Sequence, residues 1–297
     1  MTLPWEGTFT AIVTPFQSDG SPDEAALRTL VDRQVEGGVS GLVPCGTTGE
    51  GATMSTDEKI RVIDIVREQS NGRVRVLAGA GGNSTSDVIT LAKQIAGLNV
   101  DGLLIVVPYY NKPTQEGLFQ HFSAVADAVQ TPVVMYNVPG RTSANMTAET
   151  ALRLAEHGNI AGTKEASGSL PQVMEIVSNA PSDFAVLSGE DDLTLPIITL
   201  GGRGVVSVVA NQIPGMMSDM VRAALDGRVD DARKLHYKVL GLMKINFIET
   251  NPIPVKAALA MMGLIEEHYR LPLVPMSDAN RTRLHLELVR LELVEGV

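Results

Sequence analysis

Short, continuously apolar runs recur along the chain as far as residue 210, and each is followed by a longer segment with helical spacing. The runs hold five to seven residues, and most show no alternation of polar and apolar side chains. Such runs are typical of strands in a parallel sheet that helices cover on both faces. The eight runs are residues 8–13, 41–45, 74–79, 102–107, 132–137, 160–164, 184–188 and 204–210.

The segments between the runs carry the spacing of amphipathic helices. In residues 23–38, for example, Leu27, Leu30 and Val31 fall on one face. Eight alternations of strand and helix, roughly 20–35 residues apart, predict an α/β fold of the (β/α)8 TIM-barrel type. A doubly wound open sheet is the alternative, and it is disfavoured because no glycine-rich fingerprint follows the first run. Similar helical segments are residues 55–72, 84–99, 114–129 and 147–159.

The strand-like runs stop after about residue 226, and the remaining chain is helical in pattern. Residues 229–247, 251–263 and 277–294 each read as one further helix. No flexible linker separates them from the preceding part. We therefore expect a barrel over residues 1–226, followed by a C-terminal helical extension of three helices over residues 227–297, packed on the barrel or at a subunit interface.

Composition excludes several classes of partner. The 297-residue chain has a formal net charge of −10 and no basic block, which argues against binding of nucleic acid or an anionic membrane. No apolar run approaches the ~18 residues of a membrane span, and the N-terminus lacks the pattern of a signal peptide. Cys45 is the single cysteine, so a reducing compartment is expected. We predict a cytoplasmic protein, and the five histidines, which lack ligand spacing, predict no metal site.

Polar and aromatic side chains follow several of the predicted strands. Active sites of TIM barrels lie at the carboxyl ends of the strands, so these loops are the candidates for chemistry. Tyr109, Tyr110 and Tyr136, three of five tyrosines, fall in them together with Lys164 and Arg141. The loops read CGTTGE at the end of the second run, PYYNKP after the fourth, YNVPGRT around the end of the fifth, KEASG at the end of the sixth and SGEDD at the end of the seventh.

Lys164 is the sharpest candidate because it ends a predicted strand. A lysine buried in a barrel mouth loses the solvation of its ammonium group, which favours the neutral amine. A neutral amine can attack a ketone and form a Schiff base, which then serves as an electron sink. The alternative is a structural ion pair with Glu165 or another carboxylate, and position alone does not decide between the two.

The neighbouring loops hold residues that would complement an imine-forming lysine. Tyr110 and Tyr136 could donate protons, although tyrosines at strand ends are commonly packing residues. The turn that contains Thr47 and Thr48 could hold a small carboxylate, or it could be an ordinary glycine-rich turn. Arg141 could pair with a substrate carboxylate, or it could be a solvated surface residue.

Taken together, these motifs resemble the dihydrodipicolinate synthase family, the 4-hydroxy-tetrahydrodipicolinate synthases of the pyruvate-dependent class I aldolase superfamily. The resemblance runs from residues 7–16 to residues 271–281, in the family's order and at its spacing. The set is specific to this superfamily, although each motif alone is modest. The motifs are GTTGE, PYYNKPTQEGL, YNVPGRT, GTKEASG, SGEDD and NPIPVK.

The resemblance implies the family's reaction, a lyase-class condensation of pyruvate with L-aspartate 4-semialdehyde to give 4-hydroxy-tetrahydrodipicolinate. This is the first committed step toward diaminopimelate and lysine. Lys164 would form the imine with pyruvate, and Tyr136 would shuttle protons. Thr48 would link Tyr136 by hydrogen bonds to Tyr110, which in the family comes from the neighbouring subunit. The family uses no cofactor besides the covalent imine, and it is typically a homotetramer built as a dimer of dimers.

The remaining family roles concern binding. Backbone groups of Thr47 and Thr48 would hold the pyruvate carboxylate, and Arg141 would support the carboxylate of the semialdehyde. Gly189 and Val206 match positions whose backbone lines the lysine pocket. The alternative within the superfamily is another Schiff-base aldolase or lyase, acting on a 2-keto-3-deoxy sugar acid or 4-hydroxy-2-oxoglutarate, and Arg141 in the GRT motif favours the synthase. A non-catalytic binding protein on the same scaffold would be expected to lose Lys164 or Tyr136.

One departure from the family concerns feedback by lysine. Lysine-inhibited members often place histidines in the helix after GTTGE, where this chain has Thr56 and Lys59, and Gly51 replaces a common serine. A cationic Lys59 would repel the ammonium group of the effector. We therefore expect weak or absent inhibition, although Asn83, Asp87 and Tyr109 could still contribute to such a pocket.

Overall fold

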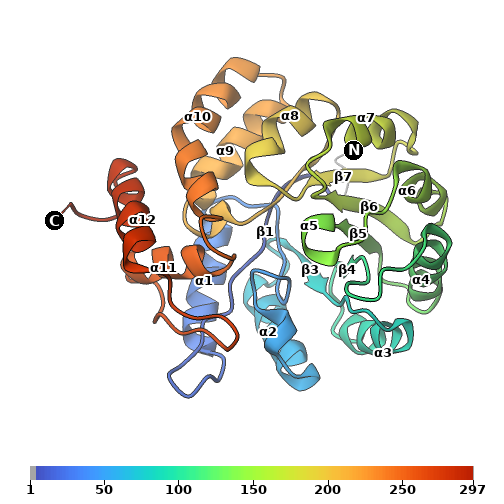
Figure 1. The fold of residues 1–297 in the computed structure, drawn as a ribbon, viewed down its shortest axis with the longest axis horizontal. Helices are drawn as coiled ribbons and strands as arrows, with labels where there is room; N and C mark the ends of the chain where they lie inside the picture. Colours follow the sequence, from blue (N-terminus) through green and yellow to red (C-terminus); the bar gives the residue numbers. More distant parts are fainter. Residues whose placement is uncertain (1–4, 297) are drawn as a thin grey trace.

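A computed structural model describes residues 5–296 and shows a closed barrel of eight parallel strands in the order β1 to β8, with β1 paired to β8 (Figure 1). The predicted TIM barrel is confirmed. Each of the eight predicted runs overlaps one strand. The strands are β1 Gly7–Thr10, β2 Gly41–Leu42, β3 Arg75–Gly79, β4 Gly102–Val106, β5 Val133–Asn137, β6 Ile160–Glu165, β7 Ala185–Ser188 and β8 Gly204–Ser207.

β1, β2 and β8 each end three residues before the predicted run does, and for β2 and β8 the structure gives the cause. The second run was expected to extend to Cys45, but Cys45 has a φ of 56°, which takes the chain out of the strand and into a turn. The last run was expected to extend to residue 210. Instead, the carboxylate of Asp191 accepts hydrogen bonds from the N–H groups of Val208 and Val209, at 3.1 and 2.9 Å, and the chain enters the short 3₁₀ helix η3 (Val209–Asn211).

Helices follow the strands and cover the outside of the barrel, as Figure 1 shows. Their starts match local capping signals: Ser55, for example, forms a capping box with Glu58 at the start of α2. The helices of this layer are α1 Glu24–Glu36, α2 Thr56–Ser70, α3 Thr85–Ala96, α4 Gln115–Asp127, α5 Pro139–Thr142, α6 Ala148–Ala155, α7 Leu170–Asn179, α8 Thr194–Thr199 and α9 Pro214–Leu225; two further 3₁₀ helices are η1 Gly51–Thr53 and η2 Asp191–Leu193.

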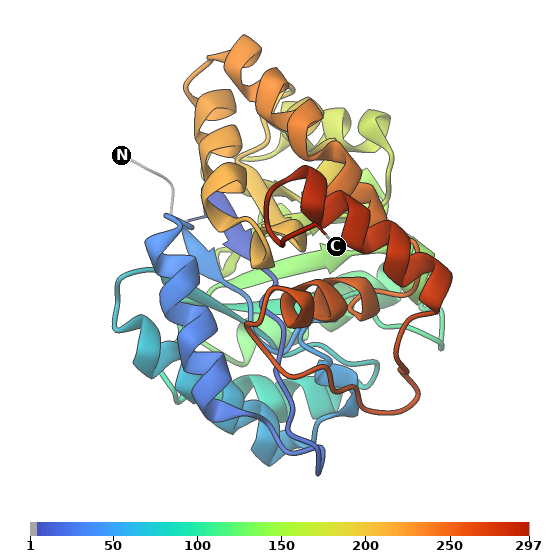
Figure 2. The same cartoon turned by 90° about the vertical axis from the view of Figure 1, so that its left-hand side faces the viewer.

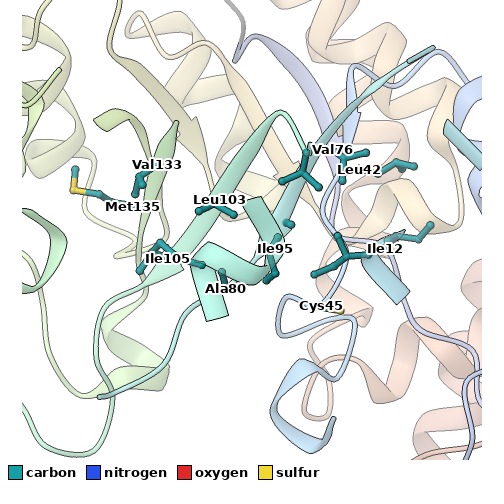
Figure 3. Close-up of a cluster of buried hydrophobic side chains, with 14 of the residues drawn as sticks. Ile12, Leu42, Cys45, Val76, Ala80, Ile95, Leu103, Ile105, Val133 and Met135 are labelled. Atoms are coloured by element: carbon teal, nitrogen blue, oxygen red, sulfur yellow. The ribbon is translucent and has the colours of Figure 1, made fainter. Parts of the chain in front are cut away.

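Apolar side chains fill the space on both sides of the sheet. The outer layer packs the strands against the helices, and Figure 3 shows part of it, with Leu103 and Ile105 from β4 and Met135 from β5. The alternate residues of the same strands, such as Leu104 and Tyr136, belong to a separate buried cluster inside the barrel. Because successive side chains of a strand point to opposite faces, a polar residue in the inner set near a strand's carboxyl end faces the barrel mouth.

Three helices follow the barrel: α10 (Val229–Ile245), α11 (Ile253–Met261) and α12 (Asp278–Arg290). Figure 2 shows α11 and α12 side by side, in orange-red and red. Apolar side chains such as Met217 of α9, Val239 of α10 and Leu284 of α12 form one buried cluster across them. The division of the chain at residue 226 stays a prediction. Within residues 5–296, no helix is long and apolar enough to cross a membrane.

Candidate active site

A cavity of about 620 Å³ opens at the carboxyl ends of the strands. The turn after β2, the ends of β5 and β6, the start of the segment after β7 and the segment before α11 all contribute to its wall. Most of the predicted site residues meet here. Those that line the cavity are Thr47, Thr48, Tyr136, Arg141, Lys164 and Gly189.

Lys164 and Tyr136 face each other across two neighbouring strands. They are paired in the register of β5 and β6, and Nζ of Lys164 lies 4.0 Å from the centroid of the Tyr136 ring. Both side chains are buried. Nζ of Lys164 makes no salt bridge within residues 5–296. Within the described residues, the amine therefore lies against an aromatic ring in a substrate-sized cavity and has no carboxylate within 4.0 Å, although Glu190 also lines that cavity.

The ion pair between Lys164 and Glu165, which the sequence left open, is not formed. Glu165 is the next residue along β6 and points to the other face of the strand, where its carboxylate accepts hydrogen bonds from Ser167, Asn137 and Gln172 at 2.8 to 3.2 Å. Burial raises the pKa of Glu165, and these hydrogen bonds oppose the rise. The carboxylate of Glu165 is thus engaged outside the cavity, and it does not pair with the amine of Lys164.

Gly189 leaves room beside the end of the lysine side chain. A Cβ atom at this position would lie 3.1 Å from Cε of Lys164 and 2.6 Å from Cβ of Ala166. The N–H group of Gly189 donates to the carbonyl of Glu165 at 2.8 Å, which keeps the two segments close. Only glycine fits this approach without displacing the lysine.

Thr48 lies in the turn of residues 46–50 and is buried, whereas Thr47 is exposed at the cavity. Oγ1 of Thr48 accepts a hydrogen bond from Nδ2 of Asn251 at 3.0 Å. A hydroxyl can donate its proton while its oxygen accepts, and within residues 5–296 no side-chain hydrogen bond uses the proton of Thr48, so it is available to a partner in the cavity. The arrangement suits a hydroxyl that passes a proton between two partners.

Arg141 lies on the short helix α5 at the rim of the cavity and is exposed. Nη2 lies 3.5 Å from the carbonyl oxygen of Asn251, and within residues 5–296 the guanidinium has no carboxylate partner. An arginine held at a cavity entrance with its fork unpaired can bind an incoming carboxylate in two-point fashion.

Two predicted site residues do not line the cavity. Tyr110 is 89% exposed, has a φ of 75°, and does not approach Lys164 of its own chain. The loop that presents it is held by a hydrogen bond from Asn111 to the carbonyl of Asn83 at 2.8 Å. Val206 is buried inside the barrel, while Val208 lines the cavity. The roles of Tyr110 and Val206 stay predictions.

Sequence reasoning assigned no role to the segment before α11 or to α11 itself. Residues 247–251 line the cavity, and Asn251 bonds Thr48. Lys256 of α11 forms an ion pair with Glu50 in which neither side chain is exposed. The NPIPVK motif was the available signal, because a lysine in so apolar a stretch needs a partner. No cluster of three or more His, Cys, Asp or Glu that could hold a metal ion occurs within residues 5–296.

Comparison with known proteins gives a consistent result. A curated relative from Koribacter versatilis, 4-hydroxy-tetrahydrodipicolinate synthase, is 57% identical over 94% of this chain and 93% of its own. The crystal structure of dihydrodipicolinate synthase from Aquifex aeolicus superposes with a TM-score of 0.96 at 41% identity, covering 98% of this chain and 100% of that one. The structure of the enzyme from Acinetobacter baumannii complexed with pyruvate gives a TM-score of 0.96 at 42% identity, covering 97% and 99%.

The family model for the dihydrodipicolinate synthetase family matches residues 4–290, nearly the whole chain, and the curated relative adds a high identity over the same length. The resemblance inferred from the motifs is confirmed. The chain belongs to the dihydrodipicolinate synthetase family.

Proposed function

We propose that this chain condenses pyruvate with L-aspartate 4-semialdehyde through an imine at Lys164 and releases 4-hydroxy-tetrahydrodipicolinate. The observation that carries the proposal is the buried amine of Lys164, which faces a cavity and the ring of Tyr136 instead of a carboxylate. Membership of the family supports the same reaction, and the curated relative bears the name of that enzyme. No observation favours the sugar-acid or 4-hydroxy-2-oxoglutarate alternative.

The first half of the reaction forms the imine. Nζ of Lys164 attacks C2 of pyruvate, and the ketone oxygen takes two protons and leaves as water. Tyr136, whose ring lies against Nζ, is placed to relay these protons, and Thr48 can pass them on through its free hydroxyl proton. The turn around Thr47 and Thr48 borders the same cavity and is the proposed seat of the pyruvate carboxylate.

The second half makes the new carbon–carbon bond and closes the ring. The imine loses a proton from C3, the resulting enamine carbon attacks the aldehyde, and the aldehyde oxygen takes up a proton. The amino group of the semialdehyde then attacks C2, and the bond from C2 to Nζ of Lys164 breaks, which frees the lysine. Arg141 at the entrance is placed to hold the carboxylate of the semialdehyde during these steps. The reaction needs no cofactor, because the lysine supplies the electron sink.

We propose further that the enzyme works as a homo-oligomer in which Tyr110 enters the site of a neighbouring subunit, within a dimer of dimers. Its high exposure and left-handed backbone support this, since a tyrosine held outward in a strained conformation is costly unless a partner uses it. We also propose a cytoplasmic location.

Borohydride reduction in the presence of pyruvate tests the assignment of the lysine. We expect one adduct per chain, mapped by mass spectrometry to Lys164; an adduct at any other lysine contradicts the mechanism. A coupled assay with aspartate semialdehyde tests the reaction, and its failure alongside cleavage of a longer 2-keto acid would favour a different aldolase.

Subunit mixing tests the crossing of Tyr110. Tyr110→Phe and Lys164→Ala are each expected to be nearly inactive. When the two are unfolded, mixed and refolded together, hybrid dimers should regain roughly a quarter of the sites, because half of the dimers are hybrids with one complete site each. No recovery would show that Tyr110 acts within its own chain.

A further inference from the structure

A second buried lysine lies beside the catalytic cavity. Lys256 of α11 has no exposed surface, and Nζ lies 2.5 Å from Oε1 of Glu50, whose side chain is also unexposed. The rings of Phe16 and Tyr269 lie 4.4 and 5.2 Å from the same nitrogen. Lys256 has no route to a substrate, so its amine is not a second imine-forming group.

Stability alone does not account for such a pair. Taking two charges out of water costs free energy that their attraction often fails to recover, and apolar replacements of similar volume are frequently as stable. Burial lowers the pKa of Lys256, and the carboxylate of Glu50 opposes that change. The pair is therefore best explained by the geometry that it imposes on its surroundings.

Glu50 is the last residue of the turn that carries Thr47 and Thr48. Its backbone is left-handed, with a φ of 53°, a conformation that an L-residue adopts at a cost. Its N–H group donates to the carbonyl of Thr47 at 3.0 Å, which closes the turn. Its second carboxylate oxygen accepts the N–H group of Arg270 at 3.3 Å. The conformation of Glu50 thus determines how the turn presents both threonines.

The same C-terminal segment contacts the turn at a second point. Asn251, immediately before α11, donates to Oγ1 of Thr48, while Lys256, within α11, binds Glu50. Asn251 and Lys256 are five positions apart in the sequence, and they bind Thr48 and Glu50, which are two positions apart in the turn. A segment that contacts a turn at two places, once before a helix and once within it, restricts both the position and the rotation of the turn.

We propose that the Lys256–Glu50 pair is a positioning device, by which α11 holds the turn of residues 46–50 where Thr48 can serve the proton relay and the turn can seat the pyruvate carboxylate. The proposal rests on the function proposed for Lys164. The proposal gives the C-terminal extension a part in imine formation, although neither Lys256 nor Glu50 touches the substrate.

The test separates positioning from stability. Lys256→Met leaves Glu50 buried and unpaired, so we expect a marked loss of Tm. Lys256→Met/Glu50→Gln removes both charges, and its Tm should return most of the way to the wild-type value. Imine formation with pyruvate, followed by borohydride trapping over time, should stay slowed by about tenfold in the double variant, because the turn is no longer held by the ion pair at residue 50. Its KM for pyruvate should rise by a similar factor, while its KM for the semialdehyde changes little.

Lys234→Met, a change of an exposed lysine on α10, is the matched control and should leave both measurements unchanged. Wild-type pyruvate kinetics in the folded double variant would overturn the proposal. If that variant does not fold, Glu50→Asp replaces it, because it keeps both charges and only shortens the side chain that joins the turn to Lys256: a severalfold loss in imine formation supports positioning by the ion pair, and wild-type rates overturn it. Trapping of pyruvate at Lys164 in the wild-type chain is measured in parallel, so failure of the proposed function is recognised separately.

Discussion

Gly189→Ala is predicted to disable the imine lysine by adding a single methyl group. The new Cβ would lie 2.6 Å from Cβ of Ala166, 3.1 Å from Cε of Lys164 and 3.2 Å from the carbonyl oxygen of Glu165. Ordinary carbon–carbon contacts lie at about 3.5–4.0 Å, so both side-chain neighbours must move. The N–H group of Ala166 donates to the carbonyl of Asn137, so the contact with Ala166 is relieved only by a shift of the backbone, whereas the contact with Lys164 is relieved by displacement of its side chain.

The magnitude follows from the two effects of the methyl group. Overpacking of a filled site costs about 1–3 kcal/mol, which lowers Tm by roughly 2–10 °C in a chain of this size. Displacement of the reacting atom by about 1 Å costs about a hundredfold in rate. We therefore expect imine formation with pyruvate to slow by about two orders of magnitude, while the protein remains folded at 25 °C.

Gly158→Ala is the matched control. Gly158 is exposed before β6, and no atom lies within 4 Å of the position that its Cβ would take. Trapping with borohydride, turnover in the coupled assay and Tm are measured for both variants. If Gly189→Ala traps pyruvate at the rate of Gly158→Ala and the wild type, the close approach of Gly189 to Lys164 has no part in the chemistry and the placement of the site is refuted.

Three further predictions concern other parts of the molecule. Arg141→Ala should raise KM for the semialdehyde by about 10- to 100-fold, the value of a hydrogen-bonded charge pair, yet leave imine formation within about twofold; equal damage to both contradicts its role. Burial lowers the pKa of His121 to about 4, so the unfolded chain takes up its proton first as pH falls below about 6.5. The wild type should therefore lose about 2 kcal/mol of stability between pH 7 and 5 that His121→Gln does not lose, as chemical denaturation at both pH values would show. Lysine should inhibit weakly, because Lys59 lines the second cavity, of about 410 Å³, beside Tyr109, and a submillimolar inhibition constant would refute this.

Most of the fold could be predicted from the sequence because the barrel repeats one simple pattern. Buried strands and amphipathic helices leave different periodicities, and eight repeats leave few alternative arrangements. The ends of β2 and β8 could not be predicted in the same way. They depend on the left-handed backbone of Cys45 and on hydrogen bonds from Val208 and Val209 to Asp191, a residue far from β8 in sequence. In the sequence, the apolar runs continue past the ends of β2 and β8, so the apolar pattern does not mark where these strands stop.

In the candidate site too, some residues could be placed from the barrel pattern and others could not. Lys164, Tyr136 and Thr48 could be placed together because each follows or ends a strand of a parallel barrel, whose carboxyl ends meet at one mouth. Asn251 could not be placed there from the sequence, because it follows a helix that comes after the eight strands. The barrel pattern does not predict that such a later segment returns to the mouth. The role proposed for Tyr110 depends on another copy of the chain, for which a strand pattern carries no information.

Two buried lysines in one molecule show what separates a structural lysine from a reactive one. From the sequence, Lys164 could form either an ion pair or an imine; the structure has a buried ion pair at Lys256 instead, and the imine is proposed at Lys164. Lys256 has Glu50 at 2.5 Å and no access to the cavity, so its charge is fixed in place. Lys164 faces a cavity of about 620 Å³, and the carboxylate next to it in sequence is directed to the other face of β6 and engaged there. Burial is common to both lysines, so what separates them is that a carboxylate binds the amine of Lys256, whereas within residues 5–296 no salt bridge engages the amine of Lys164. Glu165 therefore bears on the proposed chemistry because its carboxylate points away from Lys164.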